Sequence, residues 1–292
     1  MIEAQHVLGV KHALGEGPLW DAEEQALYWV DIPNCRVCRF YPATGEHECF
    51  DVDQRITALG LRASGGLIVT VAKGFAFWDP QTQALDVVSV PEELENPPVR
   101  FNDGAVDRKG RFWAGTMNES DPAAADGCLY RLDPDGVCHR VGTGFTISNG
   151  IGWSPDNRKM YFTDSSRRVI LVYDYDLATG AITHRRPFVH VPEEQGVPDG
   201  LTVDSEGFVW SAHWGGWKVT RYGPDGKVDR EVRLPVENVT CCAFGGENLD
   251  ELYITTARLT LSETEQKDQP LAGDLFRASV GVTGLAEPKF AG

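Results

Sequence analysis

A unit of two strands joined by a tight turn recurs along the 292 residues, and this repetition constrains the fold more than any single motif. Six segments rich in aromatic and β-branched residues, which strands favour, begin at intervals of about 40 to 49 residues, the length of one four-stranded propeller blade. A turn built largely from Gly, Pro, Asp or Asn precedes each of them. The six segments are Ala26–Asp31, Gly66–Val71, Gly110–Gly115, Lys159–Asp164, Gly207–Ala212 and Glu251–Thr256.

Closure of six such units into a ring predicts an all-β fold, a six-bladed β-propeller, as a single domain over residues 1–292. The stretch Ala4–Val10 is expected to pair with the last blade and so to close the ring. A β-sandwich is the alternative all-β architecture, but six copies of one strand–turn–strand unit favour the propeller.

The strand before each turn is expected to line the central channel, so equivalent positions of the six units face one axis. Four of these positions carry Glu, Asp or Asn followed by Gly: Glu16, Asp103, Asn149 and Asp199. Asp-Gly and Asn-Gly are also strong turn signals, yet four coincidences in one register favour a shared role. Oxygen side chains that converge would repel unless a cation neutralised them. The register therefore predicts one divalent ion on the axis.

The composition excludes several classes of partner. A formal net charge of −16 disfavours nucleic acid and anionic lipid. The first residues lack the basic and apolar regions of a signal peptide, and no apolar run approaches the roughly 20 residues that span a bilayer. We therefore expect a cytoplasmic protein without nucleic-acid or membrane partners.

The seven cysteines are an odd number without the spacing of a disulfide scaffold, which suits a reducing compartment. Cys35 and Cys38 form a C-x-x-C pair, but residues i and i+3 of a strand point to opposite faces and cannot easily share a metal. Adjacent Cys241 and Cys242 fail for the same reason. All seven are expected to be packing residues.

Six short motifs follow one another along the chain: Leu14–Pro18, Arg100–Gly104, Ala114–Met117, Ser148–Gly150, Pro198–Gly200 and Phe244–Gly246. Together they resemble the SMP-30/gluconolactonase/LRE family, which includes regucalcin and bacterial sugar lactonases. The resemblance extends over nearly the whole chain, and the set and order of the motifs are specific. It implies a six-bladed propeller with one divalent ion on its axis.

The resemblance also implies roles for individual residues. The family's metal ligands correspond to Glu16, Asn149 and Asp199. Its R-x-N-D motif corresponds to Arg100, which would contact the substrate, and Asn102, which would lie near both metal and substrate. The repeat register instead places Asp103 in the ligand position, so either residue could lie nearer the ion. Ca²⁺ is the first choice for hard oxygen ligands, with Mg²⁺, Mn²⁺, Zn²⁺ and Fe²⁺ as alternatives.

The activity implied is metal-dependent hydrolysis of a sugar lactone, an aldonolactone such as glucono-, galactono-, xylono- or arabinonolactone, in sugar catabolism. Asp199 is the candidate general base, because a carboxylate beside the ion can take a proton from water and an amide cannot. Four residues are candidates for substrate binding. They are Arg100, Asn102, Asp103 and Glu119. Regucalcin-like members carry a second Glu directly after this one, where Ser120 stands here, so their substrate preference does not transfer directly.

Three other functions suit the same residues. An aldarolactone hydrolase would need a further cation at the pocket, for which Arg258 or Lys218 is available. An organophosphate hydrolase could use the same ion, and a calcium-binding regulator would need only the ligands. His213 is a less favoured candidate base, because His, Trp and Gly residues often pack a loop.

Overall fold

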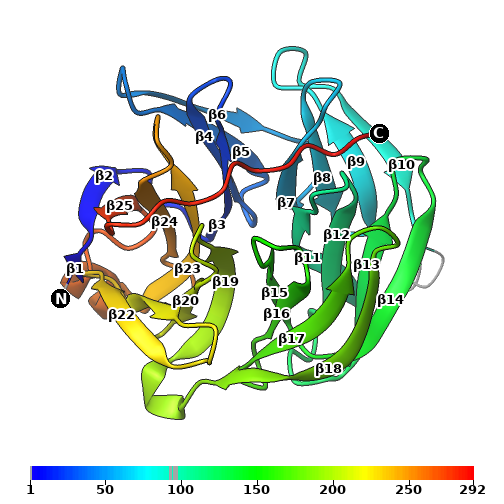
Figure 1. Ribbon diagram of the computed structural model, residues 1–292. Helices are drawn as coiled ribbons and strands as arrows, with labels where there is room; N and C mark the ends of the chain where they lie inside the picture. Colours follow the sequence, from blue (N-terminus) through cyan, green and yellow to red (C-terminus); the bar gives the residue numbers. More distant parts are fainter. Residues whose placement is uncertain (1, 92–93, 95–97) are drawn as a thin grey trace.

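Antiparallel sheets follow one another around a central axis, forming the ring seen in Figure 1. The structure is a computed structural model that describes residues 2–91, 94 and 98–292. Within these residues the strands form six sheets, five of four strands and one of five strands. The prediction of an all-β six-bladed propeller is therefore confirmed.

In each blade the strand nearest the axis is followed in the sequence by the strands farther out. The sixth blade differs only in its outermost strand, which comes from the N-terminus. The first three blades consist of β3 (Gly15–Asp21), β4 (Ala26–Asp31), β5 (Arg36–Tyr41) and β6 (Glu46–Asp51); β7 (Ile56–Leu61), β8 (Leu67–Val71), β9 (Gly74–Trp78) and β10 (Leu85–Ser89); and β11 (Val99–Val106), β12 (Phe112–Asn118), β13 (Gly127–Leu132) and β14 (Cys138–Phe145).

The other three blades follow the same order. They consist of β15 (Ser148–Trp153), β16 (Lys159–Asp164), β17 (Val169–Asp176) and β18 (Ala181–His190); β19 (Val197–Val203), β20 (Val209–Trp214), β21 (Lys218–Tyr222) and β22 (Val228–Arg233); and β23 (Asn238–Gly245), β24 (Glu251–Ala257), β25 (Leu275–Ser279) and β2 (Gln5–Leu8). A short 3-10 helix, η2 (Glu193–Gln195), precedes β19, and α1 (Glu263–Asp268) lies between β24 and β25.

Strand β2 closes the ring, because it pairs antiparallel with β25 and completes the sixth blade. This confirms the pairing expected for Ala4–Val10. The preceding β1 (Ile2–Glu3) adds in parallel to β22 of the fifth blade. The N-terminus thus ties the fifth and sixth blades together.

The apolar core lies between neighbouring blades rather than within any one of them. Trp210 of β20 packs against Phe244 of β23 with ring centroids 6.0 Å apart, and Phe75 of β9 packs against Phe112 of β12 at the same separation. Equivalent clusters of buried side chains fill the other interfaces. Aromatic residues at matching positions of the repeat therefore hold the blades together, which explains their recurrence in the sequence.

The C-terminal tail crosses one end of the ring, as the red segment of Figure 1 shows. The Gly284 amide donates to Leu249 of the sixth blade (2.7 Å), and the Phe290 amide donates to Leu61 of the second (2.7 Å). Leu285 and Glu287 of the tail line a cavity together with residues of the inner strands. This tail covers the end at which the inner strands finish, so a ligand has freer access from the end at which they begin.

The cysteines correct one prediction, because Cys38 and Cys49 form a disulfide. They lie directly opposite each other on β5 and β6, a pairing across a hairpin that spacing alone does not indicate. The expectation that all seven are packing thiols is therefore wrong for these two. Cys35 does not pair with Cys38 and carries a free thiol, in agreement with the argument against a C-x-x-C site.

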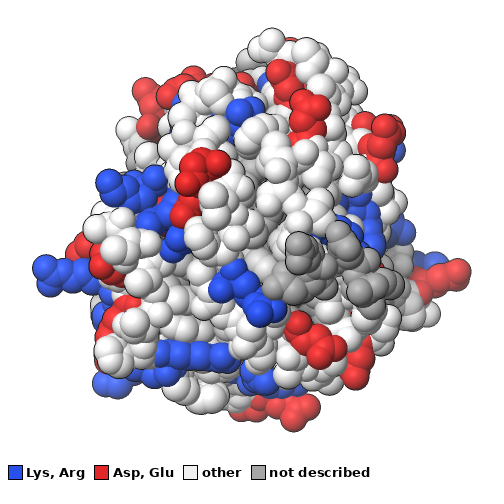
Figure 2. All heavy atoms as spheres, turned by 90° about the vertical axis from the view of Figure 1, so that its right-hand side faces the viewer, with Lys and Arg blue, Asp and Glu red and all other residues white. Residues whose placement is uncertain are grey.

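Charge on the outside of the molecule is mixed. On the face drawn in Figure 2, acidic and basic side chains are interspersed, so the net charge of −16 is not concentrated in one patch there. Among the described residues no helix is both long and apolar enough to cross a membrane.

Candidate metal and substrate site

A β-bulge interrupts every inner strand at the register predicted to face the axis. The pairing of each inner strand with the next strand shifts at this level in all six blades. A bulge bends its strand and re-aims the side chains around it, and bulges are common beside active sites. The residues at or next to the bulges include Glu16, Asn102, Asp103, Asn149 and Asp199.

All four candidate ligands and their following glycines lie inside strands and not in turns. Gly104, Gly150 and Gly200 serve close packing, whereas Gly17 has a φ of +55° and a Cβ there would meet only Ala58 Cα, at 4.0 Å. A Cβ placed on Gly200 would lie 2.2 Å from Cys241 Sγ of the next inner strand. At Gly150, where φ is +28°, a Cβ would lie 2.8 Å from the Asp199 carbonyl oxygen. The glycines therefore allow neighbouring inner strands to approach near the axis.

Three buried carboxylates repel one another at this level. Burial, followed by the charge of Asp103, raises the pKa of Glu16 to about 8. Burial also raises the pKa of Asp103 to about 6. The pKa of Asp199 lies well above its usual range, because of burial first and then the charges of Glu16 and Asp103. Groups of like charge this well buried favour a cation among them.

Asp199 also carries an unsatisfied atom, since its buried Oδ1 has no hydrogen-bond partner among the described residues. Asn149, 6% exposed, donates from Nδ2 to Ser165 Oγ (2.9 Å), which turns its Oδ1 the other way. An orphaned carboxylate oxygen, a second buried carboxylate and an amide oxygen fit a hard divalent ion. Glu16, Asn149 and Asp199 would hold it.

Asp103 belongs to the same group of carboxylates, since its charge helps to raise the pKa of both Glu16 and Asp199. Among the described residues, the carboxylate oxygens of Glu16, Asp103 and Asp199 do not all lie within 4.8 Å of one another. Asp103 Oδ1 instead accepts a hydrogen bond from the backbone N–H of Gly104 (2.7 Å). Glu16 Oε2 accepts in the same way from the backbone N–H of Gly17 (2.9 Å), so this contact does not separate Asp103 from Glu16. The choice of Glu16, Asn149 and Asp199 as ligands is the one that the resemblance implies.

Asn102 connects Asn149, a candidate metal ligand, with Arg100, a candidate substrate-binding residue. Its Nδ2 donates to Asn149 Oδ1 (2.9 Å) and to the Ser148 carbonyl (2.9 Å). Its Oδ1 accepts from Arg100 Nη1 (2.9 Å). The structure therefore brings four of the predicted residues, Arg100, Asn102, Asn149 and Asp199, to one end of the channel.

Arg55, which the sequence analysis did not identify, completes a group of charged side chains around Glu119 that we call the rim. Arg55 donates through Nη1 and Nη2 to Glu119 (2.5 and 3.1 Å), and Arg100 Nε donates to the same carboxylate (3.2 Å). Arg55 precedes β7 outside every motif, and 64 residues separate it from Glu119. The pKa of Glu119 is lowered, chiefly by its hydrogen bond with Arg55, so Glu119 is ionised and already paired.

Other rim candidates are engaged elsewhere. His213 is fully buried, with Nδ1 2.9 Å from the Gln195 carbonyl, and burial lowers its pKa to about 4. Lys218 pairs with Glu231 (2.5 Å), and Arg258 donates to Gln266 (2.6 Å). His213 is therefore a packing residue and Lys218 is engaged by a carboxylate, whereas the contact of Arg258 is to a neutral amide oxygen.

We expect the metal-free protein to lose stability as the pH rises from 6.5 to 8.5. Folding raises the pKa of Glu16 from 4.5 to about 8, so in this range the folded state holds a proton that the unfolded state lacks, and raising the pH removes that advantage. His213 acts in the opposite sense only below its ordinary pKa of 6.5. Urea unfolding should show a loss of roughly 2 kcal/mol, at about 1.4 kcal/mol per pKa unit.

The same measurement with saturating calcium supplies the control. A bound cation keeps the carboxylates ionised, so the loss between pH 6.5 and 8.5 should shrink or vanish. An equal loss with and without calcium would show that these carboxylates are not the ion's ligands.

Comparison with known proteins places this geometry in a family. Residues 14–258 match the SMP-30/gluconolactonase/LRE-like region. A pentonolactonase of Haloferax volcanii is 40% identical over 94% of this chain and 93% of its own length. Regucalcin of Xenopus laevis is 36% identical over 100% of this chain and 99% of its own length. The crystal structure of a calcium-binding regucalcin of Agrobacterium tumefaciens, 26% identical, superimposes with a TM-score of 0.94 over 99% of this chain and 97% of its own. This chain therefore belongs to the SMP-30/gluconolactonase/LRE-like family.

Proposed function

We propose that this protein is a cytoplasmic lactonase that opens an aldonolactone to the free sugar acid with the help of one divalent ion, Ca²⁺ being the first choice. The observation that carries the proposal is the buried, unpartnered Oδ1 of Asp199 among mutually repelling carboxylates. The similarity to a pentonolactonase and to a calcium-binding regucalcin supports the substrate class and the ion.

Neutral five-carbon lactones are the preferred substrates in this proposal. The extra carboxylate of an aldarolactone needs a cation at the pocket, whereas Arg55, Arg100 and Lys218 already contact carboxylates of the chain. Arg55 and Arg100 share Glu119, and Lys218 is bound to Glu231. A neutral sugar needs only hydrogen bonds, and the pentonolactonase of Haloferax volcanii is 40% identical to this chain.

The residues of the chain divide the work of ester hydrolysis. When bound, a divalent ion supplies Lewis-acid polarisation of the lactone carbonyl. Asp199 accepts a proton from the attacking water at Oδ2, since Oδ1 would bind the ion, and returns it to the ring oxygen as the ester bond breaks. Arg100 donates hydrogen bonds from its planar guanidinium to the sugar. Asn102, fixed between Arg100 and Asn149, keeps the substrate-binding and ligand groups in register.

A panel of sugar lactones, followed with a pH indicator because opening releases acid, tests the proposal. The panel should contain xylono-, arabinono-, glucono- and galactonolactone, an aldarolactone and a phosphotriester. We expect the highest kcat/KM for a pentonolactone. Fastest turnover of the phosphotriester would indicate an organophosphate hydrolase, and calcium binding without any hydrolysis would indicate a regulator.

Arg100→Lys should lower kcat/KM for the best lactone by about 10- to 100-fold, mainly through KM. A lysine ammonium cannot reproduce the fork of donors, and each hydrogen bond to a charged group that is lost costs about 1.5 to 3 kcal/mol. Steady-state kinetics measure the effect. Arg186→Lys, at an exposed arginine paired with Asp174 on the outside of the fourth blade, is the matched control and should change nothing. An unaltered KM in Arg100→Lys would remove Arg100 from the substrate site.

A further inference from the structure

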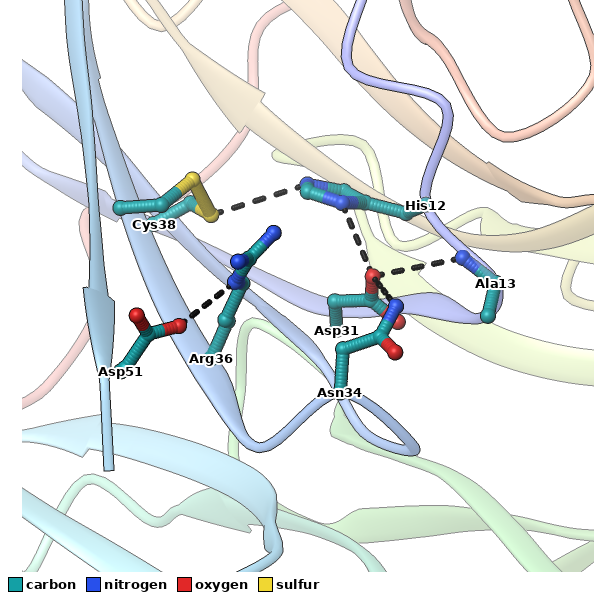
Figure 3. Close-up of a disulfide and its surroundings, with 8 residues drawn as sticks. His12, Ala13, Asp31, Asn34, Arg36, Cys38 and Asp51 are labelled. Carbon is teal, nitrogen blue, oxygen red and sulfur yellow. Dashed lines mark hydrogen bonds and ion pairs between the residues drawn. A yellow bond between two sulfur atoms is a disulfide. The ribbon is translucent and has the colours of Figure 1, made fainter. Parts of the chain in front are cut away.

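A second cluster of metal-ligating side chains lies in the first blade, away from the axis. Among the described residues, His12, Cys38 and Cys49 are the only three His, Cys, Asp or Glu side chains whose ligand atoms all lie within 4.8 Å of one another. Figure 3 shows His12 directed at the disulfide, with its Nε2 3.6 Å from Cys38 Sγ. The lactonase mechanism uses none of these atoms.

Asp31 fixes the orientation of the imidazole. Asp31 Oδ2 lies 3.1 Å from His12 Nδ1, and this carboxylate also accepts from the backbone amide of Ala13 and from Asn34 (Figure 3). It accepts from the backbone amide of Leu14 as well. With Nδ1 donating to Asp31, the lone pair of Nε2 points toward the sulfur atoms. A histidine that ligates a metal is commonly held in this way by a carboxylate on its other nitrogen.

We infer that His12, Cys38 and Cys49 form a redox-gated site for a soft divalent metal, occupied by Zn²⁺ when the two cysteines are reduced and closed when they form the disulfide. The separation of 3.6 Å between Cys38 Sγ and His12 Nε2 already matches the distance between two ligands of one zinc ion. Tetrahedral zinc, with bonds of about 2.3 Å to sulfur and about 2.1 Å to nitrogen, places two such ligands about 3.6 Å apart.

The chemistry balances with a dithiol as reductant. The dithiol transfers two electrons and two protons to the Cys38–Cys49 bond and becomes a disulfide itself, which leaves two cysteine thiols. Each sulfur can then turn about its own Cα–Cβ bond away from the other, while β5 and β6 stay paired. Zn²⁺ binding to both sulfurs and to neutral His12 releases the two thiol protons.

Burial gives the site a closed and an open side. His12 is 4% exposed and Cys38 is fully buried, whereas Cys49 is exposed. Reductant and metal can therefore reach the pair from solvent on β6, and a water can take the fourth position. Two thiolates and an imidazole select zinc over calcium, so this site and the oxygen site on the axis should not compete for one ion.

Cobalt titration of the whole protein tests the inference, because thiolate-to-cobalt charge-transfer absorption reports sulfur ligands and not the oxygen ligands of the axis. Calcium is kept in excess to fill the axial site. The protein is reduced with a phosphine, which is then removed without air. We expect the reduced protein to develop the thiolate band with one equivalent of Co²⁺, and to lose it when Zn²⁺ is added. Protein that keeps its disulfide should show no band.

Variants assign the ligands. Cys49→Ser at the exposed position should abolish the band, and His12→Gln should weaken Co²⁺ binding by at least about tenfold. Cys35→Ser, which removes a free thiol of the same blade, is the matched control and should keep the band. A reduced protein without any thiolate band would overturn the inference, as would a band that Cys49→Ser leaves unchanged. Reduction should also add two reactive thiols in a thiol titration. If it does not, the redox gating by the disulfide is refuted.

Discussion

Asp199→Asn is expected to lower kcat for lactone opening by about 10²- to 10⁴-fold, the usual contribution of a general base, while most of the ion binding is kept. The amide has nearly the shape of the carboxylate and still offers an oxygen to the ion, but it cannot take a proton from water. Without an ion the pKa of Asp199 is raised well above its usual range. A bound cation reverses that effect and keeps the base ionised. Steady-state kinetics and calorimetric calcium titration measure the two properties separately.

Asp103→Asn is the matched comparison for this variant. It removes a carboxylate of the same register that is equally buried (9% exposed, against 6% for Asp199), so it produces a similar change in the charge around the axis. We expect Asp103→Asn to retain kcat within about tenfold, because Asp103 Oδ1 is occupied by the amide of Gly104, whereas Asp199 Oδ1 is unpartnered. Equal losses in both variants would show that charge around the axis, and not proton transfer by Asp199, limits turnover.

The sequence repeat predicts the ring because every blade must meet the same packing requirement. Each blade must bury aromatic side chains against the next, so Trp, Tyr and Phe return at matching positions of the second strand. Trp29, Trp113 and Trp210 are examples, and all three are almost fully buried. Alignment on the turns then places the inner strands in a common register, which is why the repeat by itself points to Glu16, Asp103, Asn149 and Asp199.

The choice between Asn102 and Asp103 cannot be made by counting residues, and the bulge explains why. The pairing of β11 with β12 passes from Phe101 opposite Thr116 directly to Gly104 opposite Ala114, so both residues fall in the interruption. A register count assumes regular alternation and fails at such a point. Hydrogen bonds, in contrast, place Asn102 against Asn149.

Contacts between distant parts of the chain are also beyond sequence reasoning. Arg55 meets Glu119 only because the loops before β7 and after β12 reach the same rim. Cys38 meets Cys49 because the hairpin of β5 and β6 sets them opposite each other. Neither pair has a local signature, since each depends on a register or a loop path that only the folded chain fixes.

Removing the ion should reduce lactone hydrolysis by about 10³-fold or more, because a bound ion stabilises charge in the transition state by several kcal/mol and about 1.4 kcal/mol corresponds to a factor of ten. Removal should also destabilise the fold. A ligand present at about a thousand times its Kd contributes about 4 kcal/mol, and the carboxylates of Glu16 and Asp199 are left to repel each other. Activity and thermal unfolding are measured after chelation and after each of Ca²⁺, Mn²⁺ and Zn²⁺ is restored.

The two readouts together distinguish a catalytic ion from a structural one. A catalytic ion predicts that ions which restore the melting temperature equally will restore kcat unequally, because they differ as Lewis acids. A structural ion predicts that kcat follows the melting temperature whichever ion is added. Glu16→Gln provides a further test of the ion's role, since this variant keeps an oxygen ligand but removes one negative charge from the residues that bind the ion. It should weaken calcium binding more than it lowers kcat at saturating calcium, whereas activity that survives complete removal of the ion would refute the metal-dependent mechanism.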